Sequence, residues 1–265
     1  MKSVEKVAIV TGSTKGIGYC IAKQLASQGL GVIVNGRDSQ RVKQVTSELQ
    51  SVGGSVWGLA MPVELQETGK ALVHLALEKF GQVDILINNA GIIQDAMSYH
   101  MTETQFTEVI DVHVKGAFYC TKPFINAVKE QNSGGHIINM TSLAGLEGTI
   151  GQINYSAAKS ALIGMTWTLA KELKVDNIQV NAISPAALTD MTRPYLEKAK
   201  QKAAENDLPL PSYWDIGSPD DVADFVLKLL KEIKLERTGD IYGVNGSTIV
   251  KWQPPQAQPL SIEEY

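Results

Sequence analysis

Tyr155 and Lys159 are the two residues of this chain whose types and spacing best suit proton transfer. They are four positions apart where residues 156–171, rich in Ala, Leu and Met, predict a helix. At this spacing both side chains lie on one helix face, one turn apart. A phenol titrates near ~10, and a neighbouring ammonium lowers that pKa by favouring the phenolate. Such a Tyr can protonate a carbonyl oxygen or deprotonate an alcohol. The alternative is that Tyr155 covers a core and Lys159 is solvated.

The bulk properties narrow the class of protein. The 265 residues suffice for one large domain, and the net charge of -4 gives no basic surface for nucleic acid. The spacing of Cys and His suits no metal site, so we expect none. Residues 1–6 lack the apolar stretch of a signal peptide, and no apolar run is long enough to span a membrane. Cys20 and Cys120 are expected to be buried thiols in a reducing compartment. We therefore expect a cytoplasmic protein without a membrane partner.

Short β-branched runs alternate with helical patterns along most of the chain. Between the strands lie helical patterns, including residues 102–130, where Gly116 and Pro123 are potential interruptions. This alternation predicts right-handed βαβ units, and so a single α/β domain with a parallel sheet covered by helices on both faces. The predicted strands are residues 6–11, 31–34, 55–61, 83–87, 135–140, 178–183 and 240–244.

The predicted domain covers residues 1–252. Within it, residues 191–214 mix charge, Pro and Leu and look irregular, which suits a mobile flap over about residues 190–215. The tail, residues 253–265, is polar and Pro-rich, and we expect it to be extended or loosely docked.

A glycine-rich turn joins the first predicted strand to the first predicted helix. Its sequence over residues 11–18 is TGSTKGIG. Glycines let the backbone approach a pyrophosphate, and the helix N-terminus offers free N–H groups and a positive dipole end. A plain tight turn is the alternative, but the strand before and the helix after favour a dinucleotide. The expected contacts are Gly12, Ser13, Thr14, Lys15, Gly16, Ile17 and Gly18.

The end of the second strand bears on which nicotinamide cofactor is used. An acid there would bind the ribose 2′-hydroxyl, whereas an Arg accepts a 2′-phosphate. Asn35 follows the strand directly, Arg37 comes two residues later, and Asp38 is better suited to cap a helix. With Lys15 as a second cation, we predict that NADP(H) is preferred and NAD(H) possible. The alternative for Arg37 is a solvated surface charge.

Further motifs follow the later strands: residues 88–91 (NNAG) after the fourth, Ser142 after the fifth, then Tyr155 with Lys159. Together with the glycine turn, they resemble the short-chain dehydrogenase/reductase family over about residues 5–250. The resemblance implies a doubly wound Rossmann fold with about seven parallel strands. It implies that the nicotinamide gives hydride to a carbonyl carbon, and that Tyr155 is the acid/base. Lys159 would hold the nicotinamide ribose and lower the Tyr pKa.

In the same family, Ser142 would hydrogen-bond the substrate oxygen; an ordinary helix cap is the alternative. Asn89, Ala90 and Gly91 would shape the adenosine side, and a turn after a buried strand is compatible with that role.

Three positions depart from the family pattern. His113 stands where the family has an Asn whose backbone carbonyl holds a relay water. His113 could keep that role, relay protons itself with a pKa near ~6.5, or be a packed neutral His. Pro62 replaces an acid that contacts adenine, which leaves a backbone contact from Val63. The usual Pro-Gly is Pro185-Ala186, and Leu188 with Thr189 is expected at the nicotinamide amide.

The substrate is less well indicated than the reaction. His113, residues 151–155 and residues 185–192 are similar to the 3-hydroxyacyl-thioester dehydrogenase part of multifunctional fatty-acid oxidation enzymes. Reductases of 3-oxoacyl chains on acyl carrier protein share most other features, so a 3-oxoacyl thioester is the favoured substrate. Polyol, sugar-acid and cyclic-alcohol dehydrogenases of the family are alternatives, as is a catalytically silent nicotinamide-binding regulator. The family also implies a homo-oligomer, commonly a tetramer.

Overall fold

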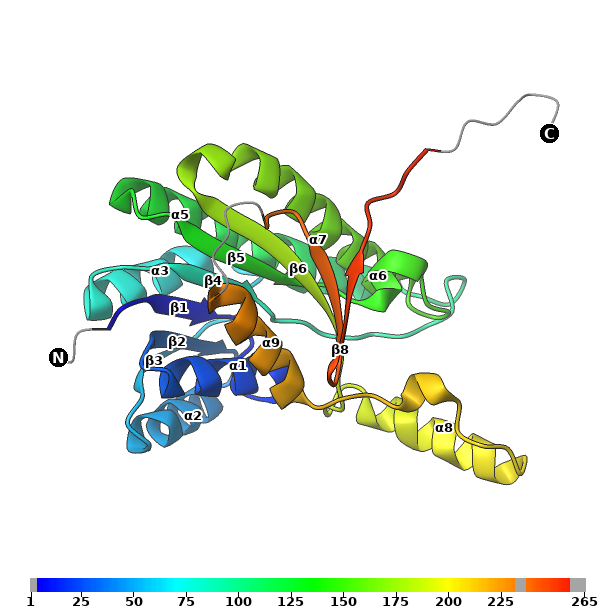
Figure 1. The fold of residues 1–265 in the computed structure, drawn as a ribbon. Coiled ribbons are helices and arrows are strands. Elements are labelled where there is room, and N and C mark those ends of the chain that lie inside the picture. The colour runs from blue at the N-terminus through cyan, green and yellow to red at the C-terminus, as the bar shows by residue number, and fades with distance from the viewer. Residues whose placement is uncertain (1–3, 232–236, 258–265) are drawn as a thin grey trace.

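A computed structural model describes residues 4–231 and 237–257 of the chain. Its strands form one sheet in the order β3-β2-β1-β4-β5-β6-β7-β8, parallel except for the last pair (Figure 1). The strands are β1 (Val7–Val10), β2 (Gly31–Gly36), β3 (Ser55–Ala60), β4 (Ile85–Asn88), β5 (Gly135–Met140), β6 (Ile178–Ala186), β7 (Ile241–Asn245) and β8 (Thr248–Trp252). The predicted α/β domain with seven parallel strands is confirmed.

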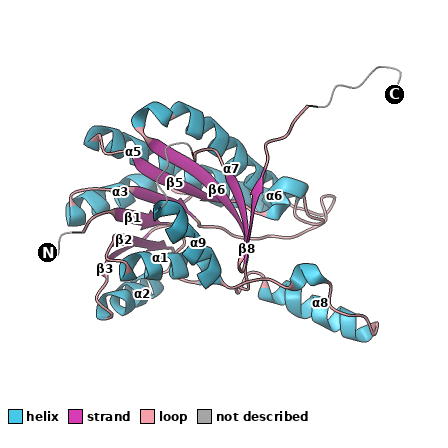
Figure 2. Ribbon diagram, in the orientation of Figure 1, coloured by secondary structure: helices cyan, strands magenta, loops and turns pink. Residues whose placement is uncertain are grey.

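Helices cover both faces of the sheet (Figure 2). They are α1 (Gly16–Ser27), α2 (Ser39–Ser51), α3 (Gln66–Phe80), α4 (Glu103–Ile110), α5 (Gly116–Gln131), α6 (Leu143–Glu147), α7 (Ile153–Glu172), α8 (Arg193–Glu205) and α9 (Pro219–Lys231). Helices α1, α2 and α9 pack on one face, with Leu25 buried there, and α3, α5 and α7 on the other, where Phe124 is buried. Because both faces are covered, the central strands are continuous apolar runs such as VAIV in β1.

The strand order reverses between β1 and β4, since β1 lies between β2 and β4 in the sheet. In open parallel sheets, ligands bind beyond the carboxyl ends of the strands at such a switch point. The glycine turn follows β1, residues 88–91 end and follow β4, and Ser142 follows β5. The fold therefore gathers the predicted motifs at one edge of the sheet.

Two parts of the chain differ from the prediction. Residues 193–205, expected to be irregular, form helix α8, which begins with Pro194 in its first turn. A Pro at that place is already set for helix geometry and lacks only an N–H that would be unpaired anyway. The second difference is β8, which the sequence did not predict and which pairs antiparallel with β7 after a tight turn at Gly246. In the tail, residues 253–257 have no regular structure; residues 258–265, and residues 1–3 at the N-terminus, lie outside the described residues.

The predicted helical stretch 102–130 is interrupted directly before Gly116, one of the two expected positions, and not at Pro123. A π-helical turn, Asp111–Lys115, separates α4 from α5, whereas Pro123 lies inside α5. Such turns are rare and often lie at functional sites. This one carries His113.

Both cysteines are free thiols: Cys120 is buried and Cys20 partly so. Burial raises the pKa of Cys120 to about 12. Within the described residues, no helix combines the length and apolarity that a bilayer crossing requires.

Candidate active site

The glycine turn is held by main-chain and buried side-chain contacts. Gly12 has φ +60°, a conformation that L side chains rarely adopt, and a Cβ there would lie 2.7 Å from Cα of Ala90. Gly18 is equally constrained, because its Cβ would lie 2.6 Å from the carbonyl oxygen of Gly12. No side chain caps the N-terminus of α1. The first turn of α1, Gly16 to Gly18, lines the cavity with its N–H groups uncapped by a side chain, which suits a pyrophosphate.

Ser13 stabilises this turn from behind. Its hydroxyl donates to the carbonyl oxygen of Val10 at 2.6 Å, and its N–H donates to that of Asn35 at 2.8 Å. The side chain is fully buried. Ser13, predicted to contact the cofactor, instead shapes the turn that would do so.

Asn89 ties the loop after β4 to the glycine turn. Its amide Nδ2 donates to the carbonyl oxygens of Thr11, at 2.9 Å, and Gly12, at 3.1 Å. The N–H groups of Asn89 and Ala90 both donate to Oγ1 of Thr11. The loop and the turn therefore form one unit.

The end of β2 supplies a cation and no acid. Arg37 is exposed and lines the same cavity as the glycine turn. Asp38 accepts from the N–H groups of Gln40 and Arg41, as a helix cap does. Asn35 is buried, and its amide donates to the carbonyl oxygens of Leu59 and Met61, so it joins β2 to β3.

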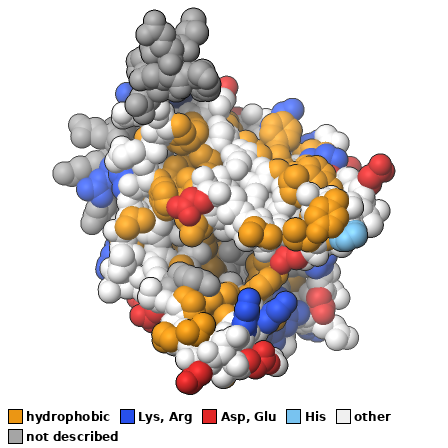
Figure 3. Space-filling model, turned by 90° about the vertical axis from the view of Figure 1, so that its right-hand side faces the viewer, with side chains coloured by type: hydrophobic (Ala, Val, Ile, Leu, Met, Phe, Trp, Pro, Cys, Tyr) orange, Lys and Arg blue, Asp and Glu red, His pale blue; other side chains and the backbone are white. Residues whose placement is uncertain are grey.

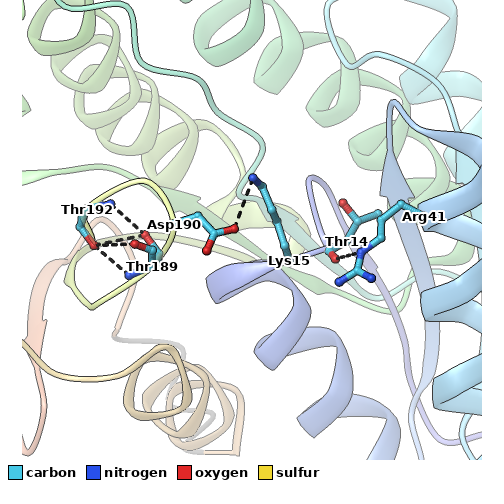
Figure 4. Close-up of polar contacts among 6 residues, drawn as sticks. All are labelled: Thr14, Lys15, Arg41, Thr189, Asp190 and Thr192. Atoms are coloured by element: carbon cyan, nitrogen blue, oxygen red, sulfur yellow. Dashed lines mark hydrogen bonds and ion pairs between the residues drawn. The ribbon is translucent and has the colours of Figure 1, made fainter. Parts of the chain in front are cut away.

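Arg41 was not singled out in the sequence. Its Nε donates to the carbonyl oxygen of Thr14 at 3.2 Å, which brings a second guanidinium to the turn (Figure 4).

Tyr155, Lys159 and Ser142 meet because α6 and α7 pack closely. A Cβ on Gly145 of α6 would lie 2.6 Å from the carbonyl carbon of Lys159, so only Gly permits this approach. Nζ of Lys159 donates to the carbonyl oxygen of Met140 at 2.6 Å and lies 5.4 Å from the Tyr155 ring centroid. Ser142 caps α6 and also hydrogen-bonds Tyr155, which places it beside the predicted acid/base; its bond to a substrate oxygen stays a prediction.

The pKa of Tyr155 moves in the direction opposite to the expected one. Burial raises it to about 12; the hydrogen bond to Ser142 acts against this rise, and the charge of Asp95 adds to it. Burial also lowers the pKa of Lys159 to about 7. The sequence argument took Lys159 to be a charged ammonium, whereas the buried Lys159 is only partly charged at neutral pH. Tyr155 is therefore a protonated phenol, which suits proton donation.

His113 lies beside this group, with its ring centroid 5.3 Å from that of Tyr155. Its Nε2 is 2.8 Å from the carbonyl oxygen of Ile92. Burial, and then the charge of Lys159, lower the pKa of His113 to about 3. The structure therefore has a packed, neutral His113 at neutral pH, with which the predicted role of its backbone carbonyl is compatible.

The loop after β6 closes the cavity at the nicotinamide side of the predicted site. Pro185 and Thr189 line the cavity, and the Thr189 N–H donates to Oγ1 of Thr192 at 2.8 Å (Figure 4). Lys15 reaches across from the glycine turn to Asp190, with Nζ 3.6 Å from Oδ2. Leu188 is not a lining residue; its N–H donates to the carbonyl oxygen of Gly217.

These parts enclose one cavity of about 630 Å³. Figure 3 shows the face of the molecule on which α8 lies, where hydrophobic side chains gather around a hollow. The glycine turn, the uncapped helix end and Arg37 fit a pyrophosphate and an adenosine phosphate at one end. Val63, Ala90 and Gly91 also line the cavity, as do Tyr155 and Lys159. The residues present thus fit a nicotinamide dinucleotide, whose chemistry is hydride transfer.

A second polar group in the cavity was missed in the sequence. Asp95 accepts from Nε2 of Gln152 at 3.0 and 3.1 Å and from the hydroxyl of Tyr195 at 2.5 Å. Asp95 and Tyr195 both line the cavity. No local motif joins them, because they are 100 positions apart.

Comparison with known proteins agrees with this site. The family model described as short chain dehydrogenase matches residues 6–200. The chain belongs to the short-chain dehydrogenase family, and it is an oxidoreductase acting on hydroxyl and keto groups.

Individual relatives are consistent with this assignment. The chain is 39% identical over 243 residues to "3-oxoacyl-[acyl-carrier-protein] reductase FabG" of Aquifex aeolicus (strain VF5), covering 91% of this chain and 96% of that protein. It is 38% identical over 220 residues to the "Peroxisomal hydratase-dehydrogenase-epimerase" of Saccharomyces cerevisiae, covering 79% of this chain and 24% of that protein. A short chain dehydrogenase from Mycobacterium avium superposes with a TM-score of 0.84 at 29% identity, covering 99% and 90% of the two chains.

Proposed function

We propose that this chain is an NADP(H)-dependent reductase of 3-oxoacyl thioesters. The observation that carries the proposal is the pairing of a protonated Tyr155, hydrogen-bonded to Ser142, with a cavity whose cofactor end carries Arg37 and no acid at the end of β2. Relatives named for 3-oxoacyl-[acyl-carrier-protein] reduction support the substrate class.

A nicotinamide cofactor, held by the glycine turn and Lys159, would supply the hydride for the ketone carbon. Tyr155 donates its proton to the ketone oxygen as negative charge develops there. Ser142 hydrogen-bonds the same oxygen, and this preorganised donor favours the transition state. Lys159, fixed through Met140, would bind the nicotinamide ribose and return a proton toward Tyr155. His113 stays neutral and packs against the Tyr155 ring.

The cofactor preference rests on charge at the end of β2. Arg37 would accept the 2′-phosphate, and Arg41 would support the neighbouring turn through Thr14. Lys15 would exchange its weak exposed pairing with Asp190 for that phosphate.

We also propose a homo-oligomer, a tetramer by analogy with the family. Large apolar side chains are exposed on α4, α5 and α7, at Phe106, Phe118 and Ile153. Two free and at least partly buried thiols are consistent with a cytoplasmic location, which we propose as well.

Steady-state kinetics with NADPH and NADH test the proposal. The substrates are an N-acetylcysteamine thioester of 3-oxobutanoate, a sugar acid and a cyclic ketone, with Tyr155→Phe as the inactive reference. We expect turnover of the thioester with NADPH, and at least about tenfold lower kcat/KM with NADH, the equivalent of one charge-assisted contact. Arg37→Gln should remove that preference and leave NADH kinetics unchanged. Turnover of only the sugar acid or the cyclic ketone would overturn the proposed thioester substrate. A preference for NADH would overturn the proposed cofactor.

A further inference from the structure

One carboxylate lies at the substrate end of the cavity and has no part in the proposed proton transfer. Asp95, in the loop after β4, is held by Gln152, which precedes α7, and by Tyr195 in the first turn of α8. Three segments of the chain therefore fix this carboxylate in one place. Three of its acceptor positions are used, and it remains exposed to the cavity.

The negative charge of Asp95 acts where the substrate carbonyl would lie. It raises the pKa of Tyr155, in the same direction as burial. The carboxylate and the proton donor are thus electrostatic neighbours.

Cations in the described lining of the cavity lie elsewhere. Lys15 and Arg37 are at the cofactor end, and Nζ of Lys159 is bonded to Met140 beneath Tyr155. Around Asp95 the lining is mainly apolar. The lining residues near Asp95 and its partner Tyr195 in the chain include the apolar Ile92, Ile93, Met191 and Pro194. A substrate carboxylate placed here would lie near the negative charge of Asp95. Its other neighbours would be apolar, and no cation in the described lining would lie beside it.

We propose that Asp95 is a specificity-determining residue that excludes substrates carrying a carboxylate next to the reacting ketone and admits neutral ones. This inference rests on the proposed function and sharpens it, since it separates the thioester of a 3-oxo acid from the free acid. Two unit charges about 6 Å apart in a partly open cavity repel enough to change binding about tenfold.

The test uses two substrates that share one ketone: 3-oxobutanoate and its N-acetylcysteamine thioester. Asp95→Asn removes the charge and keeps an oxygen that can accept from Gln152 and Tyr195. We expect the kcat/KM ratio of thioester to free acid to fall about tenfold in this variant, through a lower KM for the acid. Thioester kinetics should change little.

Two further variants separate local charge from other effects. Asp176→Asn makes the same chemical change at the opposite edge of the sheet, before β6, where the carboxylate pairs with Lys129 at 2.7 Å. Tyr195→Phe removes one hydrogen bond and keeps the Asp95 charge. Both should leave the substrate ratio unchanged. An unchanged ratio in Asp95→Asn, or equal loss of both substrates, would overturn the inference.

If the wild type turns over neither compound, the proposed function fails. The inference about Asp95 is then tested by ligand binding alone. Calorimetric titration of the complex with NADP⁺ then compares 3-oxobutanoate with its methyl ester. Tighter binding of the anion by Asp95→Asn than by the wild type, with ester binding unaltered, supports charge exclusion. Equal binding of the anion by the two proteins, or none by either, contradicts it.

Discussion

The two ends of the cavity are held in different ways. The cofactor end is fixed by hydrogen bonds to main-chain groups within a closely packed unit. The Asn89 amide donates to the Thr11 carbonyl oxygen, and the Ser13 N–H donates to the Asn35 carbonyl oxygen. The substrate end is fixed by the side chains of Asp95, Gln152 and Tyr195. Tyr195 reaches across from α8, a helix in which Leu196 is the buried residue. Figure 1 shows α8 projecting from the body of the molecule. Side-chain changes at the substrate end should therefore alter selectivity while cofactor binding persists.

The largest effect on binding is expected at Gly18, where the main chain of α1 lies closest to the main chain of the glycine turn. In Gly18→Ala, the new Cβ would lie 2.6 Å from the Gly12 carbonyl oxygen and 3.0 Å from Cα of Ser13. Neither atom can move without displacing the turn, so we expect the Kd for NADPH to rise about 10- to 100-fold. Fluorescence titration measures it. Gly164→Ala in α7 is the control, since its Cβ would meet no atom within 4 Å, and it should add about 0.5–1 kcal/mol of stability. Wild-type affinity for NADPH in Gly18→Ala would show that close main-chain packing does not fix the cofactor end.

Lys159 lies where the two ends meet, and its burial should show in the pH dependence of stability. Its pKa is about 7 when folded and 10.5 in the reference state. Unfolding therefore binds a proton between these values, and wild-type stability rises with pH across that window. Lys159→Met lacks this contribution. The free energy of unfolding of the wild type, relative to that of Lys159→Met, should therefore rise by about 1 kcal/mol per pH unit from pH 7 to 9. Urea unfolding of both proteins measures this difference. The two cysteines and Tyr155 also have raised pKa values, but their contributions to the pH dependence are common to both proteins and cancel in the difference. A difference that did not change with pH would mean that Lys159 is better solvated than its burial indicates.

His113 gives the corresponding effect on the acid side. Its pKa is about 3 when folded, against 6.5 in the reference state, so unfolding binds a proton between those values. The stabilisation is complete above pH 6.5 and is lost as pH falls toward 3. His113→Asn should therefore lose less stability than wild type between pH 6.5 and 4.5, by about 1 kcal/mol per unit. His136, with a pKa lowered to about 4 by burial, contributes equally to both proteins. Parallel pH profiles for the two proteins would exclude a neutral buried His113.

The smallest effect is expected at the substrate end. Tyr195→Phe loses one hydrogen bond to Asp95, worth about 1 kcal/mol, so we expect KM for the thioester to rise about fivefold. The Kd for NADPH should not change, because Tyr195 lies at the other end of the cavity. Tyr99→Phe, at a side chain that is 74% exposed, is the matched control. Equal weakening of cofactor and substrate binding would show that the two ends are coupled.

The sequence predicted the parts of the molecule that are local. A β-branched run, a glycine turn and a helix start are consecutive in the chain, so the cofactor end followed from residues 6–40. The fold followed from the alternation of such runs with helical patterns along the whole domain. Ser142, Tyr155 and Lys159 were brought together as expected. Strand β8 was missed because its side chains are largely exposed and show no alternation.

The remaining differences come from tertiary contacts. The Asp95 group joins segments 57 and 100 positions apart, which no motif records. The pKa directions of Tyr155 and His113 depend on burial, which the sequence does not display. Helix α8 was missed because its charge and Pro content resemble a loop, although the Pro stands where helices accept it.

The order of strands also has a consequence for how the molecule reaches its native state. The cavity draws on residues from Gly12 to Tyr195, and its floor requires β1, β4, β5 and β6 to pair side by side. Parallel pairing of distant segments is slow compared with the formation of single helices. After dilution from denaturant, the circular dichroism of the helices should therefore recover before the ability to bind a dinucleotide does, and a chain cut between α7 and β6 should recover only the former.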